Sequence, residues 1–338
     1  AIGEGRGGVG GAGRMGVAAK PGRKIPVIWL VRVGVSAVVL ALIFYFVPFK
    51  QVWATARALS PALWLAALAL FLLGHAAAAA KWRLLIGPGI GFAAAFRAHL
   101  AGLAANLALP GVAGGDVVRA GLVMPQAHDK AQLAIGSVAD RLLDTVGLLL
   151  IALVGAYVAW RPELGDPQAL RLLMLTGVGA VIIGFAVAIP LDRAMTRRSG
   201  GKVFKLVARV VAVVADLART PGLLLACLAI SMAVQCLFIL INVAFAQAAH
   251  VEAPVAAWFY AWSTAKIIAI APISLGGLGV REASMAALMK PFGADPAQVV
   301  AIGLVWQTVL YASGLIGFLV QLRWPSPKLT KLEQVHEG

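Results

Sequence analysis

Two arginines each stand one helical turn beyond a break rich in proline and glycine, where their side chains could bind a phosphate group. Arg119 follows the break in LPGVAGGDVVR, and Arg281 follows the break in PISLGGLGVR. A guanidinium can donate two parallel hydrogen bonds to phosphate oxygens. The N-terminus of a helix that starts at such a break also favours an anion. The alternative is that each arginine is a cation that extends to the interface between lipid and water.

Acidic residues and glycines accompany both arginines. Asp116 lies three residues before Arg119, where it could pair with this arginine or cap its half-helix, and Glu282 directly follows Arg281. Each carboxylate could therefore be a partner of its arginine and nothing more. The glycines that we expect to open the two half-helices beside the anion are Gly114, Gly115, Gly276 and Gly277.

Three ionisable residues, Asp140, Arg141 and Asp144, interrupt an otherwise apolar segment. An ion at the centre of a bilayer costs roughly 2.5–3.5 kcal/mol on insertion scales, so these residues should face inward and pair. Arg141 and Asp144 have the spacing of a helical ion pair, and Asp140 shares a helix face with Asp144. We interpret the three as the lining of a polar path, with a buried structural salt bridge as the alternative. Lys266 and Asn106 are candidates for the same lining.

The composition places these residues in a membrane protein. Of the 338 residues, 61% are apolar and 13% are charged, and the mean hydropathy is +0.90. A soluble domain is about one quarter charged. The formal net charge of +15 indicates topology and contact with anionic lipid, not with nucleic acid. The two cysteines, Cys227 and Cys236, are predicted to be packing residues, and we expect neither a metal nor a cofactor.

Six segments are long and apolar enough to cross a bilayer, which takes about 20 residues. Two further regions, 92–125 and 255–291, are apolar but interrupted halfway by proline and glycine. Lysine and arginine collect in cytoplasmic loops, which places both termini in the cytoplasm. The two broken regions then form re-entrant hairpins that enter from opposite sides, or short hairpins that cross fully with the same parity. The six expected spans are 27–47, 61–80, 132–158, 170–190, 222–249 and 297–322.

The two broken regions resemble each other. Pro110, Gly114, Gly115 and Arg119 in the first recur at the same spacing as Pro272, Gly276, Gly277 and Arg281 in the second. Because the hairpins enter from opposite sides, we predict an inverted repeat, about 92–158 and 255–322. Secondary transporters often place their substrate site between such repeats. The alternative is that duplicated hairpins merely pack against each other.

The remaining segments complete the expected organisation. Residues 1–24 are glycine-rich and basic and are predicted to be a disordered tail. A single membrane domain should cover 25–322, followed by a cytoplasmic tail at 323–338. Within that domain, residues 202–219 have valines on one helical face and cations on the other, which indicates a helix in the interface plane. A linker between the two halves is the alternative reading of that helix.

Motifs for enzyme chemistry are absent from the sequence. The five histidines are scattered without the H-E-x-x-H spacing, and neither a Walker A lysine motif nor G-x-S-x-G occurs. We therefore predict no catalytic residue and interpret the histidines as packing residues.

Three motifs in this order resemble the lysylphosphatidylglycerol synthase transmembrane-region family, whose members are also called flippase-like membrane proteins. They are NLALPGVAGGDVVRA at 106–120, SVADR at 137–141 and PISLGGLGVRE at 272–282. The likeness covers about residues 27–322. It implies a lipid path lined by the motif residues, from Asn106 to Glu282. The sequence shows no soluble aminoacyl-transfer domain, so we expect no synthase activity.

These observations together predict an all-α polytopic protein of the bacterial inner membrane that moves lipid between leaflets. The expected substrate is a phospholipid or another lipid with an anionic or phosphate-bearing headgroup, and the motion is passive or coupled to an ion gradient. One alternative is a non-transporting partner of a lipid-modifying enzyme or glycosyltransferase. Another is a lipid transferase embedded in the membrane.

Overall fold

The computed structural model describes residues 49–108, 113–160, 167–198, 200–270 and 279–324, and this part of the chain is built from helices without a β-strand. The expected span at 27–47, both tails and the breaks at Pro110 and Pro272 lie outside these residues. The α-helices are α2 (Phe49–Ala58), α3 (Pro61–Leu85), α4 (Phe92–Ala108), α5 (Ala113–Val123), α6 (Lys130–Ala159), α7 (Pro167–Thr196), α8 (Lys202–Arg219), α9 (Pro221–Ala248), α10 (Val255–Ile268), α11 (Val280–Met289) and α12 (Pro296–Arg323).

Five of these helices are long and apolar enough to cross a membrane, namely α3, α6, α7, α9 and α12. They correspond to the expected spans at 61–80, 132–158, 170–190, 222–249 and 297–322. An all-α polytopic membrane fold is therefore confirmed for the described residues. Large apolar side chains on the outside agree with lipid contact; Leu175 and Ile182 of α7, for example, are 73% and 63% exposed.

Side chains in the sequence set where several of these helices begin. The carboxylate of Asp129 accepts the N–H groups of Ala131 and Gln132 and starts α6. Asp295 accepts the N–H group of Ala297 at 3.0 Å and starts α12. Such N-caps satisfy donors that have no partner within the helix, and each typically stabilises a helix by about 1 kcal/mol.

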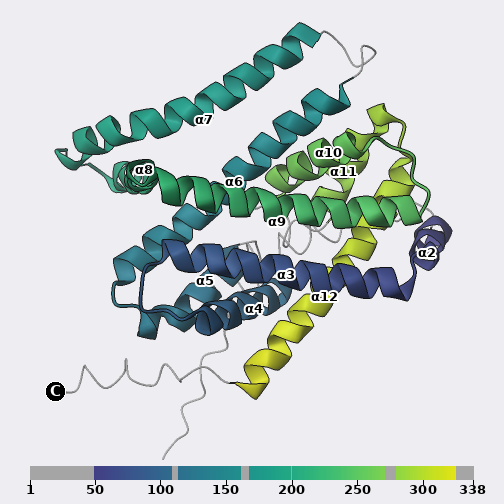
Figure 1. Ribbon diagram of the computed structural model, residues 1–338, viewed down its shortest axis with the longest axis horizontal. Helices are drawn as coiled ribbons and strands as arrows, with labels where there is room; N and C mark the ends of the chain where they lie inside the picture. Colours follow the sequence, from purple (N-terminus) through teal and green to yellow (C-terminus); the bar gives the residue numbers. More distant parts are fainter. Residues whose placement is uncertain (1–48, 109–112, 161–166, 199, 271–278, 325–338) are drawn as a thin grey trace, which may run out of the picture.

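Helices α3 and α9 form an antiparallel pair at the centre of the molecule (Figure 1). Near the middle of the pair, the rings of Phe71 and Phe238 lie 4.8 Å apart. Further along α3, Lys81 Nζ donates to Ser231 Oγ at 2.7 Å. The residue number falls along α9 as it rises along α3, so the end of α3 lies beside the start of α9.

The two broken regions form helical hairpins at opposite ends of this pair. The first hairpin, α4 and α5, follows the end of α3, and the second, α10 and α11, follows the end of α9 (Figure 1). Within the first hairpin the backbones touch, because a Cβ atom built on Gly115 would lie 2.4 Å from the carbonyl oxygen of Gly102. Only glycine allows two helices to approach so closely at this point.

Each hairpin also packs closely against a long helix of the opposite half of the chain. A Cβ atom on Gly155 of α6 would lie 2.5 Å from the backbone nitrogen of Tyr260 in α10. A Cβ atom on Gly317 of α12 would lie 2.2 Å from the carbonyl oxygen of Leu100 in α4. The two halves are therefore interlocked, with α6 against α10 and α12 against α4.

Helices α7 and α8 form an arm at the edge of the molecule (Figure 1). Arg219 at the end of α8 bonds to Asp192 of α7 at 2.8 Å and to Asp216 of α8 at 2.7 Å. These hydrogen bonds raise the pKa of Arg219. The bounds of α8 agree with the amphipathic helix expected at 202–219.

Candidate functional site

A cavity of about 580 Å³ lies between the two hairpins and the central helices, and its lining is rich in charge. Helices α3, α4, α5, α6, α9, α10, α11 and α12 all contribute to its walls. We call it the charged cavity. Its polar and ionisable lining residues are His75, Lys81, His99, Asn106, Asp116, Arg119, Asp140, Arg141, Asp144, Thr145, Ser231, Gln235, Lys266 and Arg281.

Lys81 is the centre of the buried ion network in this cavity. Its ammonium lies 2.9 Å from Asp140 Oδ1 and 2.5 Å from Asp144 Oδ1, and its side chain is 1% exposed. Ser231 of α9 accepts a hydrogen bond from Lys81 and donates one to Asp144 at 2.8 Å. A buried charge is tolerated only when it is paired and hydrogen-bonded. This cluster thus joins α3, α6 and α9 inside the membrane domain.

Arg119 extends the network from α6 into the first hairpin. Its Nη2 donates to Asp140 Oδ2 at 2.6 Å, and its Nε lies 3.2 Å from Asp116 Oδ1. The guanidinium also lies 4.6 Å from the centroid of a Trp82 ring, which adds a cation–π contact. The ion pair expected between Asp116 and Arg119 is confirmed, but Arg119 has the second and shorter partner Asp140.

Arg141 does not make the ion pair that we expected within its own helix. Its Nε bonds to Asp116 Oδ2 at 2.5 Å, across to the first hairpin, whereas Asp144 bonds to Lys81. Helical spacing allows the Arg141–Asp144 pair, but Lys81 of α3 and Asp116 of α5 lie closer to these groups. The ionisable residues of α6 therefore pair with residues of α3 and α5. These contacts between helices replace the pair that the spacing within α6 allows.

The N-terminal ends of α5 and α11 both lie at the charged cavity. Asn106, at the end of α4, accepts the Gly115 N–H group through Oδ1 at 2.9 Å. Gly279 precedes α11 with a φ of 80°, a conformation that favours glycine, and its N–H group donates to Glu282 Oε2 at 2.8 Å. Asn106 and Glu282 therefore hold the first turns of these two helices.

The second hairpin brings two further cations to the cavity. Lys266 Nζ donates to the neutral Gln235 Oε1 at 2.8 Å and lies 5.8 Å from the centroid of the Phe238 ring. Arg281 bonds to Glu282 and, at 3.2 Å, to Gln307. Among the described residues, no carboxylate lies within ion-pair distance of Lys266. The charge of this ammonium is therefore available to pair with an anion in the cavity.

The predicted site residues converge on this one cavity. Asn106, Gly115, Asp116, Arg119, Asp140, Arg141, Asp144, Lys266 and Arg281 all line it. Glu282 is 1% exposed and does not line the cavity. Its carboxylate pairs with Arg281, and its side chain packs against Gly303 of α12. Gly114 lies in the first turn of α5 without lining the cavity, and Gly276 and Gly277 fall outside the described residues.

The family comparison agrees with this arrangement. Residues 29–317 match the family model described as lysylphosphatidylglycerol synthase TM region. The chain belongs to this family. A search of curated proteins finds no match. In this lysylphosphatidylglycerol synthase TM-region protein, every residue that lines the charged cavity falls within the matched segment, so the family assignment and the cavity concern the same part of the chain.

Several cavity residues escaped the sequence analysis. Lys81 stands directly after the span expected at 61–80 and was not among the predicted site residues, but it is buried in the ion network. His75 and His99 were interpreted as packing residues, but they line the cavity and bond to each other, with 2.9 Å between Nδ1 and Nε2. A signal was present, because His75, Ala78 and Lys81 are spaced three residues apart and share one face of α3.

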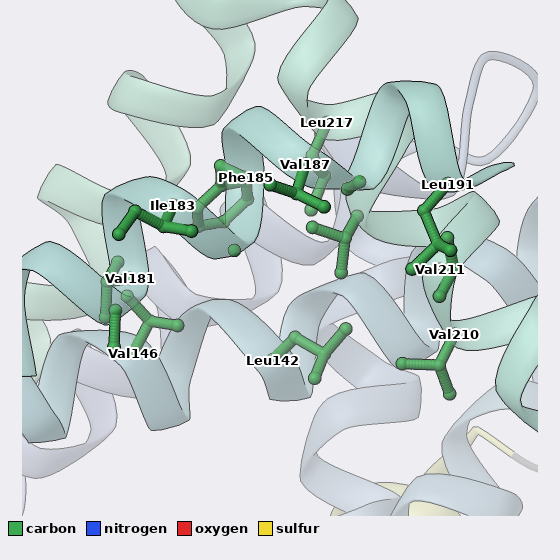
Figure 2. Close-up of a pocket in the computed structure, with 14 residues that line it drawn as sticks. Leu142, Val146, Val181, Ile183, Phe185, Val187, Leu191, Val210, Val211 and Leu217 are labelled. Atoms are coloured by element: carbon green, nitrogen blue, oxygen red, sulfur yellow. The ribbon is translucent and has the colours of Figure 1, made fainter.

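A second cavity, of about 660 Å³, lies between α6, α7 and α8 and has a different character (Figure 2). Its lining side chains are all apolar, such as Leu142 of α6, Phe185 of α7 and Val210 of α8. It offers no group that could bind an ion or a headgroup. In a membrane domain such a space suits hydrocarbon, whereas the ionisable side chains gather in the charged cavity.

Proposed function

We propose that this protein is a lipid translocase that moves a phosphate-bearing or anionic headgroup between membrane leaflets through the charged cavity. One observation carries the proposal: both hairpins, far apart in sequence, bring their ionisable residues to one cavity between membrane-spanning helices. The proposal includes transport without a catalytic step, a location in the bacterial inner membrane and cytoplasmic N- and C-termini.

The cavity solves the main energetic problem of lipid translocation. A headgroup loses its water when it enters hydrocarbon, and an isolated ion in an apolar medium costs tens of kcal/mol. Lys266 and Arg281 from the second hairpin and Arg119 from the first can replace that water for a phosphate. The apolar tails need no such path, because the bilayer and the exposed apolar faces of α7 and α12 accept them.

An inverted repeat with re-entrant hairpins is part of the proposal. It is supported by the antiparallel course of α3 and α9, which makes the hairpins begin at opposite ends of this pair. It is also supported by equivalent contacts between the two halves. Helix α6 of the first half packs on α10 of the second, and α12 of the second half packs on α4 of the first. The contact glycines, Gly155 and Gly317, have the same separation in sequence as Arg119 and Arg281. Such repeats support alternating access to a site between them.

A flipping assay with a matched pair of variants tests this function. Purified protein is reconstituted in vesicles with fluorescent phosphatidylglycerol, and the fraction reduced by external dithionite measures exchange between leaflets. We expect Lys266→Gln to slow the wild-type rate at least about tenfold, since removing a charged hydrogen-bond donor typically costs 1.5–3 kcal/mol. Lys290→Gln, at the exposed end of α11, is the control and should keep the full rate.

Two results would contradict the proposal. Wild-type protein that leaves the labelled lipid in its original leaflet would exclude translocation of this lipid class and favour a role as the partner of a lipid-modifying enzyme. Equal rates for Lys266→Gln and Lys290→Gln would show that headgroups do not pass through the charged cavity.

A further inference from the structure

The charged cavity holds two histidines in direct contact. His75 of α3 and His99 of α4 meet with 2.9 Å between Nδ1 and Nε2, and their ring centroids lie 5.0 Å apart. Both rings line the cavity. We propose that this histidine pair takes up one proton when an anionic headgroup enters the charged cavity. The inference rests on the proposed function. It links movement of the anionic lipid across the membrane to movement of a proton.

Hydrogen bonding fixes the protonation state of the two histidines. Arg119 Nη1 lies 3.3 Å from His99 Nδ1, and a guanidinium has donors but no acceptor, so His99 Nδ1 must accept. A neutral His99 then carries its proton on Nε2 and donates it to His75 Nδ1. His75 in turn carries its own proton on Nε2. Both rings are therefore neutral when all contacts are made.

An added proton has no place in this chain of hydrogen bonds. A proton on His99 Nδ1 would face the Arg119 donor, and a proton on His75 Nδ1 would face the N–H group of His99. Either site breaks one contact, and the first one releases Arg119 Nη1. Arg119 keeps its ion pairs with Asp116 and Asp140, so the released N–H group can donate to a headgroup oxygen that comes within reach, without loss of the ion network.

The surrounding charges make proton uptake depend on an anion. The nearby carboxylates are already paired with cations, and the excess of cations repels a further positive charge on the histidines. An anion that enters the cavity offsets this repulsion, so the proton and the anion favour each other's binding equally. Helices α9 and α12 present uncharged side chains here. The charged groups facing the pair are Lys81 of α3, Asp116 and Arg119 of α5, Asp140, Arg141 and Asp144 of α6, Lys266 of α10 and Arg281 of α11.

The histidines are the groups best suited to accept this proton. Among the described residues that line the charged cavity, they are the only side chains that are neutral bases. Asp140 and Asp144 form ion pairs with Lys81, and Asp116 forms one with Arg141. An unperturbed histidine gains and loses a proton within the physiological pH range, and in this cavity the entering anion has to offset burial and the surrounding cations.

The test measures proton uptake on binding. Detergent-solubilised protein in weak buffer with a pH indicator is titrated with dihexanoyl-phosphatidylglycerol, and calorimetry gives the Kd. We expect about one proton per bound lipid and a Kd that tightens about tenfold for each unit of falling pH, as linkage of one proton requires. Binding without proton uptake, or a Kd independent of pH, would overturn the inference.

A double variant tests whether the histidines are the source. His75→Asn with His99→Gln replaces both bases by amides that can still hydrogen-bond, and it should bind the lipid without proton uptake. His250→Asn is the control, because His250 is exposed and has a φ of 56°, which asparagine adopts readily. Proton uptake that persists in the double variant would place the proton elsewhere and refute the assignment.

A spectroscopic measurement on the wild type covers the case in which the double variant does not fold. With ¹⁵N-labelled histidine in nanodiscs, adding the lipid at constant pH should change one ring from neutral to protonated; unchanged ring nitrogens would refute the inference.

Failure of the proposed function and failure of the histidine inference are distinguishable. If the protein flips lipid at a rate independent of pH, the proposed function stands and the histidine inference fails. If lipid binding takes up a proton but no lipid is flipped, the histidine inference stands and the proposed function fails. Equal uptake with sulfate, which does not itself titrate near neutral pH, would support the proton site but not lipid recognition.

Discussion

Removing the ammonium of Lys81 should destabilise the protein because it leaves one particular carboxylate without a cation. After Lys81→Met, Asp140 still bonds to Arg119 at 2.6 Å, but Asp144 keeps only the hydroxyl of Ser231 at 2.8 Å. Breaking a buried ion pair from one side typically costs about 3–5 kcal/mol, mainly through the orphaned charge. We expect a loss of that size in the free energy of unfolding.

The second substitution distinguishes this explanation from a general loss of packing. Lys81→Met combined with Asp144→Asn removes the orphaned charge and should recover most of the lost stability, whereas Asp140→Asn should recover much less. Reversible unfolding in mixed detergent micelles, followed by tryptophan fluorescence, gives these free energies. Arg219→Met breaks the exposed pairs with Asp192 and Asp216 and should cost much less stability than Lys81→Met, because solvent screens exposed ion pairs. If the Asp144→Asn and Asp140→Asn double variants were equally stable, the assignment of partners would be wrong.

Two further predictions concern the first hairpin and the orientation of α9. Gly115→Ala should destabilise the protein by about 1–3 kcal/mol, because its Cβ would lie 2.4 Å from Gly102 O. Gly121→Ala, with open space around it in the same helix, should not destabilise the protein in the same unfolding assay, since alanine favours a helix more than glycine does. Gly201→Cys, at the start of α8, and Glu252→Cys, which follows α9, should react with an impermeant thiol reagent from opposite sides of oriented vesicles in a cysteine-free background. Labelling of both from one side would exclude a spanning α9.

The helices could be predicted from the sequence because their signals are local. The spans expected at 222–249 and 297–322 differ by one residue at each end from α9 and α12. Hydrophobic length sets such a helix, and an N-cap such as Asp295 fixes its start.

The pairing of charges could not be predicted in the same way. The position of Asp144 on α6 indicates that it faces inward, but its partner Lys81 lies 63 residues earlier in the chain. Which faces of α3, α6 and α9 meet depends on packing, including the close contact of Gly155 with α10. For the same reason, His75 and His99 read as isolated residues until α3 and α4 are placed side by side.

The corner between α7 and α8 has a mechanical consequence. Arg219 binds Asp192 and Asp216 together, so it holds the end of α8 beside the C-terminal part of α7. If α8 lies in the interface plane, this contact also places that part of α7 at the level of the interface. A change in bilayer thickness then has to be accommodated along the rest of α7, beside the apolar cavity that α6, α7 and α8 line.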